Sequence, residues 1–183
     1  GTMQEPTRLD WTCATEAEKW VPALANGVTF EQKIAVRNAF PDGKGAVLST
    51  VGVVDLLDTN ISISDRLSDR LGGQRIPGVV AGLRSIGDYK TRGDFKYAPS
   101  ASELSHDRQL GKYVVLGLLH GKGLSFPFGH VPRMEDLPDR VLVYQVNIGT
   151  RTIETDLRAS VMTRKTVEGV WQEAGRDAAH LLE

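Results

Sequence analysis

The chain has 183 residues, of which 40% are hydrophobic and 25% are charged, and its formal net charge at pH 7 is -1. These values are typical of a globular protein whose core is large enough to be stable without disulfides. The 22 basic side chains are balanced by 23 acidic ones, whereas proteins that hold a nucleic-acid backbone usually carry a basic excess. Nucleic-acid binding over a broad surface is therefore disfavoured, although a local basic patch is compatible with the composition.

The chain contains one cysteine, Cys13, which cannot form a disulfide or a multi-cysteine zinc site within the chain. This fits the cytoplasm or another reducing intracellular compartment. No stretch approaches the roughly 20 apolar residues of a membrane-spanning helix, and the N-terminus lacks a signal-peptide pattern. We expect Gly1 and Thr2 to be a tag remnant and residues 3–183 to form a single globular domain.

Helices are predicted near the N-terminus. The first begins at Thr15, where Glu18 completes a capping box. It ends before Pro22, unless that proline opens a further helix. Another helix is predicted over 29–40, where Gln32 takes the capping-box position and the apolar residues form a helical stripe.

The middle of the chain mixes apolar runs with turns. The valine-rich run 46–57 predicts a buried strand. The four-residue repeat in 64–71 predicts a short helix with a solvated charged face. Residues 76–86 predict a second strand, and 87–99 a loop or hairpin that turns at Gly93.

A further helix begins at Ser100 or Ser102 and runs toward Gly111. The segment 112–119 could continue this helix or form a separate strand. Its tyrosine and adjacent valines favour a strand.

The last third of the chain has clearer signals. Residues 125–131 predict a short extended piece and 134–137 a single helical turn. The run 140–148 predicts a strand, and 152–157 alternates as a second strand, which makes a hairpin.

The C-terminal segment predicts an amphipathic helix that begins at Thr163 or Thr166. Trp171 is its expected anchor on the rest of the protein. The fold class expected from these elements is α+β, with a central, mostly antiparallel sheet on which N-terminal helices and one C-terminal helix pack. The apolar side of the C-terminal helix comprises Val167, Val170, Trp171, Ala174, Ala178 and Leu181.

Residues 117–123 (GLLHGKG) resemble a phosphate-binding loop only in composition. A nucleotide-triphosphatase loop has four residues between its glycine and the Gly-Lys pair, followed by a hydroxyl that holds magnesium. Here only three residues intervene, and Gly123 replaces the hydroxyl. A glycine-rich turn between two strands is the favoured reading; the alternative is a looser anion-binding turn, with the Gly121 and Gly123 backbone and the charges of Lys122 and Arg133 as its ligand groups.

His120 and His130 flank this loop and are the candidate proton-transfer residues. Their spacing matches no compact metal-ligand motif, so we predict no metal and no cofactor. Cys13 could be a nucleophile near a helix N-terminus, but no histidine is tied to it by a local signature, and a buried structural cysteine is favoured.

The segment 88–97 interleaves aromatic and basic residues, a pattern that can bind single-stranded nucleic acid or a protein surface. Its local charge is low, so nucleic acid is the less favoured ligand. The simplest alternative is a hairpin with one aromatic face in the core. The candidate interaction surface consists of Tyr89, Lys90, Arg92, Phe95, Lys96 and Tyr97.

No complete catalytic constellation is recognisable. The sequence therefore favours a non-enzymatic interaction or assembly domain, acting on a protein partner or on itself through this surface and through strand edges in 46–57 and 141–157. The alternative is an enzyme or ligand-binding domain for a phosphorylated or anionic small molecule held by the 120–133 loop.

Overall fold

The fold is known from a computed structural model. It describes residues 15, 27–41, 47–61, 63, 65, 81–121, 124–151 and 154–180. Apart from Thr15, the first predicted helix lies outside these residues, as do Cys13, the predicted helix at 64–71 except for Asp65, and the pair Lys122 and Gly123.

The described residues form a mixed five-stranded sheet with three helices, which confirms the α+β class. The sheet order is β1-β2-β3-β4-β5. Three neighbouring pairs are antiparallel, and only β3 and β4 run parallel. The strands are β1 (Val28–Pro41), β2 (Val47–Asp58), β3 (Ser85–Arg92), β4 (Arg140–Gly149) and β5 (Thr155–Thr163). The helices are α3 (Ala101–Leu104), α4 (Arg108–His120) and α5 (Arg164–His180), with 3-10 turns η1 (Phe95–Tyr97) and η2 (Met134–Asp136).

The prediction of a helix over 29–40 is wrong, because this segment is strand β1. Its side chains alternate with a period of two: Ile34 and Val36 are buried, whereas Lys33 and Ala35 are exposed. The predicted N-terminal helical layer is therefore absent from 27–41. The hairpin β1–β2 takes this place in the described part of the fold.

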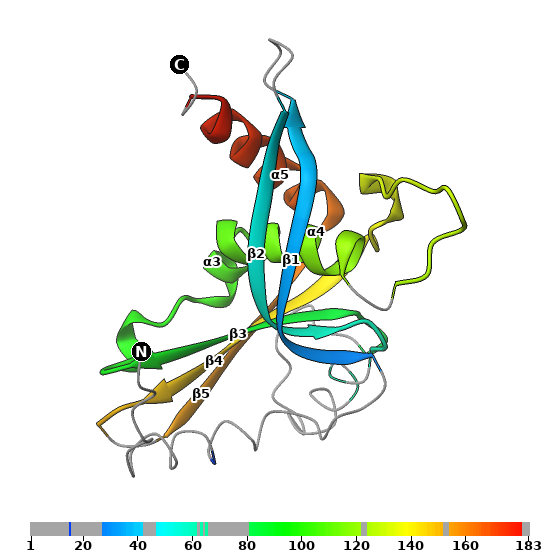
Figure 1. The fold of residues 1–183 in the computed structure, drawn as a ribbon. Coiled ribbons are helices and arrows are strands. Elements are labelled where there is room, and N and C mark those ends of the chain that lie inside the picture. The colour runs from blue at the N-terminus through cyan, green and yellow to red at the C-terminus, as the bar shows by residue number, and fades with distance from the viewer. Residues whose placement is uncertain are drawn as a thin grey trace, which may run out of the picture.

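The β1–β2 hairpin has two parts that meet at Glu31, whose φ of 46° lies in the left-handed region. The pairing of the two strands skips Glu31 and Asp55, and its register shifts again between Val36 and Phe40. Beyond Glu31 the hairpin leaves the plane of the other strands and stands over α4 and α5 (Figure 1). Consequently β2 pairs with β3 only over Leu56–Asp58.

Residues 112–119 belong to helix α4, so the strand favoured by the sequence is wrong there. Asp107 caps the helix by accepting a hydrogen bond from the Leu110 amide at 2.8 Å. Every residue from Val114 to Leu119 is buried. This half of the helix is covered on all sides and shows no polar face, so its helical periodicity is hidden in the sequence.

The prediction for 76–99 is corrected by β3, a single strand over Ser85–Arg92 that lies parallel to β4. Residues 87–92 are therefore neither a loop nor part of a hairpin. The predicted capping serine is Ser100, which forms a capping box with Glu103. The helix it starts is short, because Asp107 begins α4 as a second helix.

The remaining elements follow the predictions. The helical turn near Met134 is η2, and β4 and β5 form the expected antiparallel hairpin. The C-terminal helix is α5, and Val167, Val170 and Ala174 are buried on its apolar side. None of the helices in the described part of the chain is long and apolar enough to cross a membrane.

Two buried clusters hold the sheet. The first lies between the sheet and α4 and α5, and it includes Ile34, Val114 and Val143. The second lies on the opposite face of the sheet and includes Tyr144 and Val146. Alternation along β4 places consecutive residues in different clusters. The layers position the edge of β2 next to α4, where a groove forms.

Candidate interaction groove

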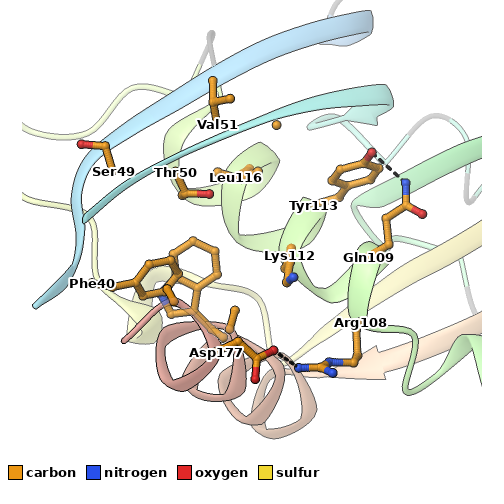
Figure 2. A pocket seen from close by; sticks show the side chains of 14 residues that line it. Phe40, Ser49, Thr50, Val51, Arg108, Gln109, Lys112, Tyr113, Leu116 and Asp177 are labelled. Carbon is orange, nitrogen blue, oxygen red and sulfur yellow. Dashed lines mark hydrogen bonds and ion pairs between the residues drawn. The ribbon is translucent and has the colours of Figure 1, made fainter. Parts of the chain in front are cut away.

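A groove of about 690 Å³ lies between β2 and helices α4 and α5. Figure 2 shows β2 on one side and α4 on the other, with α5 across from them. Gly52 allows β2 to approach α4 closely, since a Cβ on it would lie 2.5 Å from Leu116 Cδ1. The groove is lined by Phe40, Ser49, Thr50, Val51, Gly52, Arg108, Gln109, Lys112, Tyr113, Leu116, Trp171, Ala174, Asp177 and Ala178.

The β2 side of the groove is a strand edge. Between Val47 and Asp55, β2 pairs with β1 on one side, and no described strand pairs with it on the other. Val51 and Val53 are 60% and 44% exposed on the outer face of this segment. An edge with unpaired backbone groups and exposed β-branched side chains is a template for another extended chain.

Two cations lie on the helical side of the groove, and they differ in whether they form ion pairs. Arg108 forms ion pairs with Asp177 at 2.5 Å and Glu173 at 3.4 Å. These side chains are more than half exposed, so solvent screens the pairs and they contribute little stability. Lys112, one turn further along α4, has no ion-pair partner among the described residues. Arg108 and Lys112 together balance the charges of Asp177 and Glu173, and Lys112 differs from Arg108 in lacking an ion pair within this part of the chain.

Apolar and aromatic groups complete the groove. Phe40 and Trp171 pack with ring centroids 4.7 Å apart. Tyr113 accepts a hydrogen bond at its hydroxyl from the Gln109 side chain at 2.8 Å, which fixes its ring along α4 (Figure 2). The groove therefore combines aromatic surface, a strand edge and the side chain of Lys112, which forms no ion pair within the part of the chain that the structure describes.

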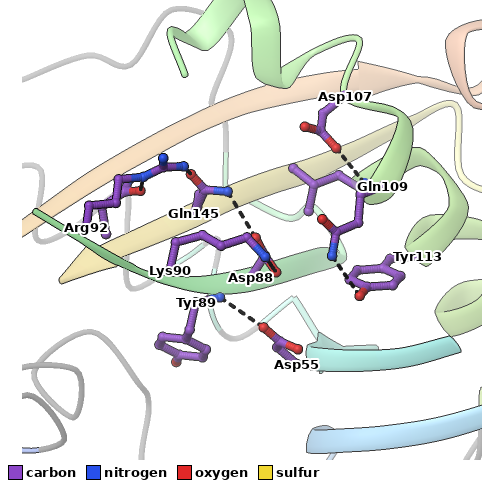
Figure 3. Close-up of polar contacts among 11 residues, drawn as sticks. Asp55, Asp88, Tyr89, Lys90, Arg92, Asp107, Gln109, Tyr113 and Gln145 are labelled. Carbon is purple, nitrogen blue, oxygen red and sulfur yellow. Dashed lines mark hydrogen bonds and ion pairs between the residues drawn. The ribbon is translucent and has the colours of Figure 1, made fainter. Parts of the chain in front are cut away.

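A separate polar network lies on the helix-facing side of β3 and β4 (Figure 3). Asp88 is 2% exposed and accepts hydrogen bonds from Lys90 and Gln145, both at 2.9 Å. Arg92 donates to the Gln145 and Asn147 side chains and to the Tyr97 carbonyl oxygen. Burial raises the pKa of Asp88 above its ordinary value, and its partners Lys90 and Gln145 oppose that shift.

This network links strand β3 to the turn η1. Every polar contact of Arg92 given above is to a neutral oxygen, and one of them fixes the turn η1 to the sheet. Lys90 remains partly exposed, with 35% of its side-chain surface accessible. The arrangement fits a structural role, because each buried polar group in it has a partner.

The predicted aromatic and basic residues do not form one continuous surface. Tyr89 packs against the second buried cluster, whereas Lys90 and Arg92 point to the opposite face of the sheet. Lys96 and Tyr97 lie on η1, where the lysine is 4.9 Å from the tyrosine ring centroid. Tyr97 is 71% exposed. Strand β3 therefore divides the surface that the sequence grouped together.

The predicted anion loop begins at the end of α4. His120 is the last residue of this helix, and burial lowers its pKa below the ordinary value. The amide of Gly121 donates to the Gly117 carbonyl at 3.0 Å, so this N–H is already used within the helix cap. Neither residue lines the groove.

The second half of that loop is held by local contacts. His130 hydrogen-bonds to Asp136 at 2.7 Å and stacks on Phe126 with ring centroids 5.1 Å apart. Arg133 Nε lies 3.7 Å from Glu135 Oε2. The pKa of Asp136 is lowered, chiefly by the Arg133 backbone amide and then by His130. His130 is therefore paired through Nε2, whereas the Arg133 guanidinium is largely exposed, at 69%.

Sequence reasoning missed the main groove residues Arg108, Lys112 and Tyr113. The sequence signal that could have found them is the placing of Ile34 and Val36 on either side of the small Ala35, flanked by the charged Lys33 and Arg37, which fits a strand and hence a long hairpin. Of the two predicted edge regions, β2 has a free edge and β5 is the outer strand of the sheet. The prediction is wrong for β4, which lies between β3 and β5.

No group of three or more histidine, cysteine, aspartate or glutamate side chains in the described part of the chain is placed to hold a metal ion. No protein-family model matches the chain, and no curated protein matches it significantly. One similar solved structure is the crystal structure of SSO0001, with 13% sequence identity and a TM-score of 0.39. The match covers 85% of this chain but only 50% of the other, so this chain spans about half the length of that protein.

Proposed function

We propose that this protein is a non-enzymatic interaction domain that holds a segment of a partner polypeptide in the groove between β2 and helices α4 and α5. One observation carries the proposal: a groove of about 690 Å³ runs beside an edge of β2 that no other described strand pairs with. Specific binding sites usually combine an apolar surface with a few polar groups, and this groove has both.

The energetics support binding at this place. Phe40, Trp171 and Tyr113 offer partly exposed aromatic surface within a concave lining, and aromatic and arginine residues are common anchors of interfaces. The exposed Val51 extends this surface onto β2. Covering the groove would remove these groups from water, and each Å² of apolar surface covered contributes roughly 25 cal/mol before the costs of association.

The alternative function, binding of a small anionic molecule by the 120–133 loop, has less support. The Gly121 amide is committed to the helix cap, and His130 and Arg133 each lie beside an acidic side chain. An incoming anion would have to displace these contacts.

Photocrosslinking in the native host tests the proposal. Benzoylphenylalanine replaces Ser49, which lines the groove, and in a matched strain it replaces Gln172, an exposed residue of α5 outside the lining. We expect an adduct with a polypeptide from Ser49 that is absent from Gln172. Equal adducts at the two positions, or none at Ser49, would overturn the proposal.

A further inference from the structure

We infer that the groove takes an extended, acidic polypeptide segment that adds to β2 as a further strand. This inference rests on the proposed function and specifies the chemistry of the partner.

The unpaired edge of β2 sets the conformation of the occupant. In an antiparallel or parallel ladder, the N–H and C=O groups of alternate residues point to each side of a strand. Those on one side of β2 are satisfied by β1, whereas those on the other side have no strand partner between Ser49 and Val54 among the described elements. An extended backbone can pair with such a row, which a helix cannot do.

The sheet also sets the place of the added strand. Strand β3 lies beside β2 at Leu56–Asp58 and then diverges, because the hairpin bends at Glu31. A new strand would occupy the position next to β2 that β3 leaves, between β2 and α4. Figure 2 shows this position bounded by Val51 on β2 and by Lys112 and Tyr113 on α4.

Charge sets the composition of the occupant. The Arg108 charge is already matched by Asp177 and Glu173, whereas Lys112 has no ion-pair partner within the described residues. Side chains of an added strand alternate between two faces. Those facing α4 would meet Lys112, which favours carboxylates, and those on the outer face would lie beside Val51 and Val53, which favours aliphatic residues.

The same charge argument disfavours a second copy of this chain as the occupant. Of its two outer strands, β5 has its one carboxylate, Asp156, paired with Arg158. The other outer strand, β1, carries the exposed cations Lys33 and Arg37. Pairing that strand in the groove would bring further positive charge toward Lys112, and like charges placed opposite each other are destabilising. A separate partner with acidic and aliphatic residues in alternation fits better.

The test uses three synthetic heptapeptides with a fluorescent label and the full chain. The first, TVEVEVT, has the inferred pattern. The second, TVKVKVT, reverses the charge, and the third is TVEVEVT with N-methyl groups on alternate backbone amides. We expect anisotropy titrations to show at least about tenfold weaker binding of the second and third peptides than of the first, a difference of 1.4 kcal/mol.

Variants of Lys112 link the preference to this groove. We expect Lys112→Gln to abolish the preference for the acidic peptide and Lys112→Glu to reverse it. Thermal unfolding of both variants serves as the folding control, and the glutamine variant carries the test if the glutamate variant does not fold. Amide hydrogen exchange between Ser49 and Val54 should slow when TVEVEVT binds.

Several results would overturn the inference. They are equal binding of the N-methylated peptide, equal binding of the two charge patterns, and no binding of TVEVEVT. If any of them occurred while the Ser49-specific crosslink was present, the interaction domain would stand and its partner would not be an acidic strand. Absence of that crosslink would instead overturn the proposed function itself.

Discussion

Phe40 near the end of β1 and Trp171 in α5 pack against each other, with their ring centroids 4.7 Å apart and their planes tilted by 40°. Such a tilted pair contributes roughly 0.5–1.5 kcal/mol beyond the burial of its surface. The contact joins the projecting part of the hairpin to the C-terminal helix, and both rings line the groove. The stability of the hairpin and the shape of the groove are therefore linked.

Truncating the tryptophan tests this link. We expect Trp171→Ala to lower the free energy of unfolding by about 2 kcal/mol, less than the 3–5 kcal/mol typical of a fully buried ring, because Trp171 is only partly buried. Urea denaturation measures the change. The neighbouring exposed residue provides a control, Gln172→Ala, which should change stability by less than about 0.5 kcal/mol. Equal effects of the two substitutions would contradict the assignment of Trp171 as the anchor.

Two glycines of α5 give a matched comparison. A Cβ on Gly169 would meet nothing within 4 Å, whereas on Gly175 it would lie 3.1 Å from Phe40 Cδ1. We expect Gly169→Ala to stabilise the protein by about 0.5–1 kcal/mol through helix propensity. Gly175→Ala should gain less, or lose stability, since Phe40 must move. Thermal unfolding of both variants measures this, and a larger gain from Gly175→Ala would show that the ring is not held there.

The close approach of β3 to Tyr144 gives a third prediction. A Cβ on Gly87 would lie 2.4 Å from Tyr144 Cζ, and the tyrosine ring is itself buried. We expect Gly87→Ala to cost about 1–3 kcal/mol by overpacking. Gly93→Ala is the control, because the nearest atom to its Cβ would be 3.9 Å away on the flexible Arg151 side chain. Chemical denaturation that finds the two variants equally stable would exclude this packing.

His120 predicts a loss of stability in acid. Burial lowers its pKa below 6.5, so the unfolded chain takes up a proton before the folded protein does. Stability should therefore be complete above pH 6.5 and fall as the pH decreases from 6.5 toward the lowered pKa. We expect His120→Gln to flatten this part of the stability curve, measured by urea denaturation between pH 5 and 8. A curve that keeps the same slope in this variant would contradict the prediction.

The wrong helix over 29–40 shows how local signals can mislead. Thr29 and Gln32 have capping-box spacing, and their side chains do interact, since the Thr29 hydroxyl donates to Gln32 Oε1 at 2.9 Å. They do so at the start of a strand. The pairing of β1 with β2 outweighs the local preference, and tertiary context commonly overrides helix propensity. The period of two over 32–37 was the better guide.

The prediction for residues 112–119 of helix α4 was wrong for the opposite reason. Its residues Tyr113, Val114 and Val115 favour strands locally, yet they lie in a helix enclosed by the sheet and α5. Helix α5 was predictable because its polar face is visible in the sequence. The β4–β5 hairpin was predictable because its turn is clear. The groove was not, because its lining comes from β1, β2, α4 and α5, and only tertiary packing brings these elements together.

The single parallel pairing in the sheet has a consequence for how the chain folds. Strands β3 and β4 align in eight residue pairs, from Ser85 with Leu142 to Arg92 with Gly149. Along the chain, α3, α4 and both 3-10 turns lie between these two strands. Contacts of long sequence separation form late, because the loop must close before they can stabilise it. The two antiparallel hairpins can form early, so the central seam between β3 and β4 is the step expected to limit the rate at which the native sheet assembles.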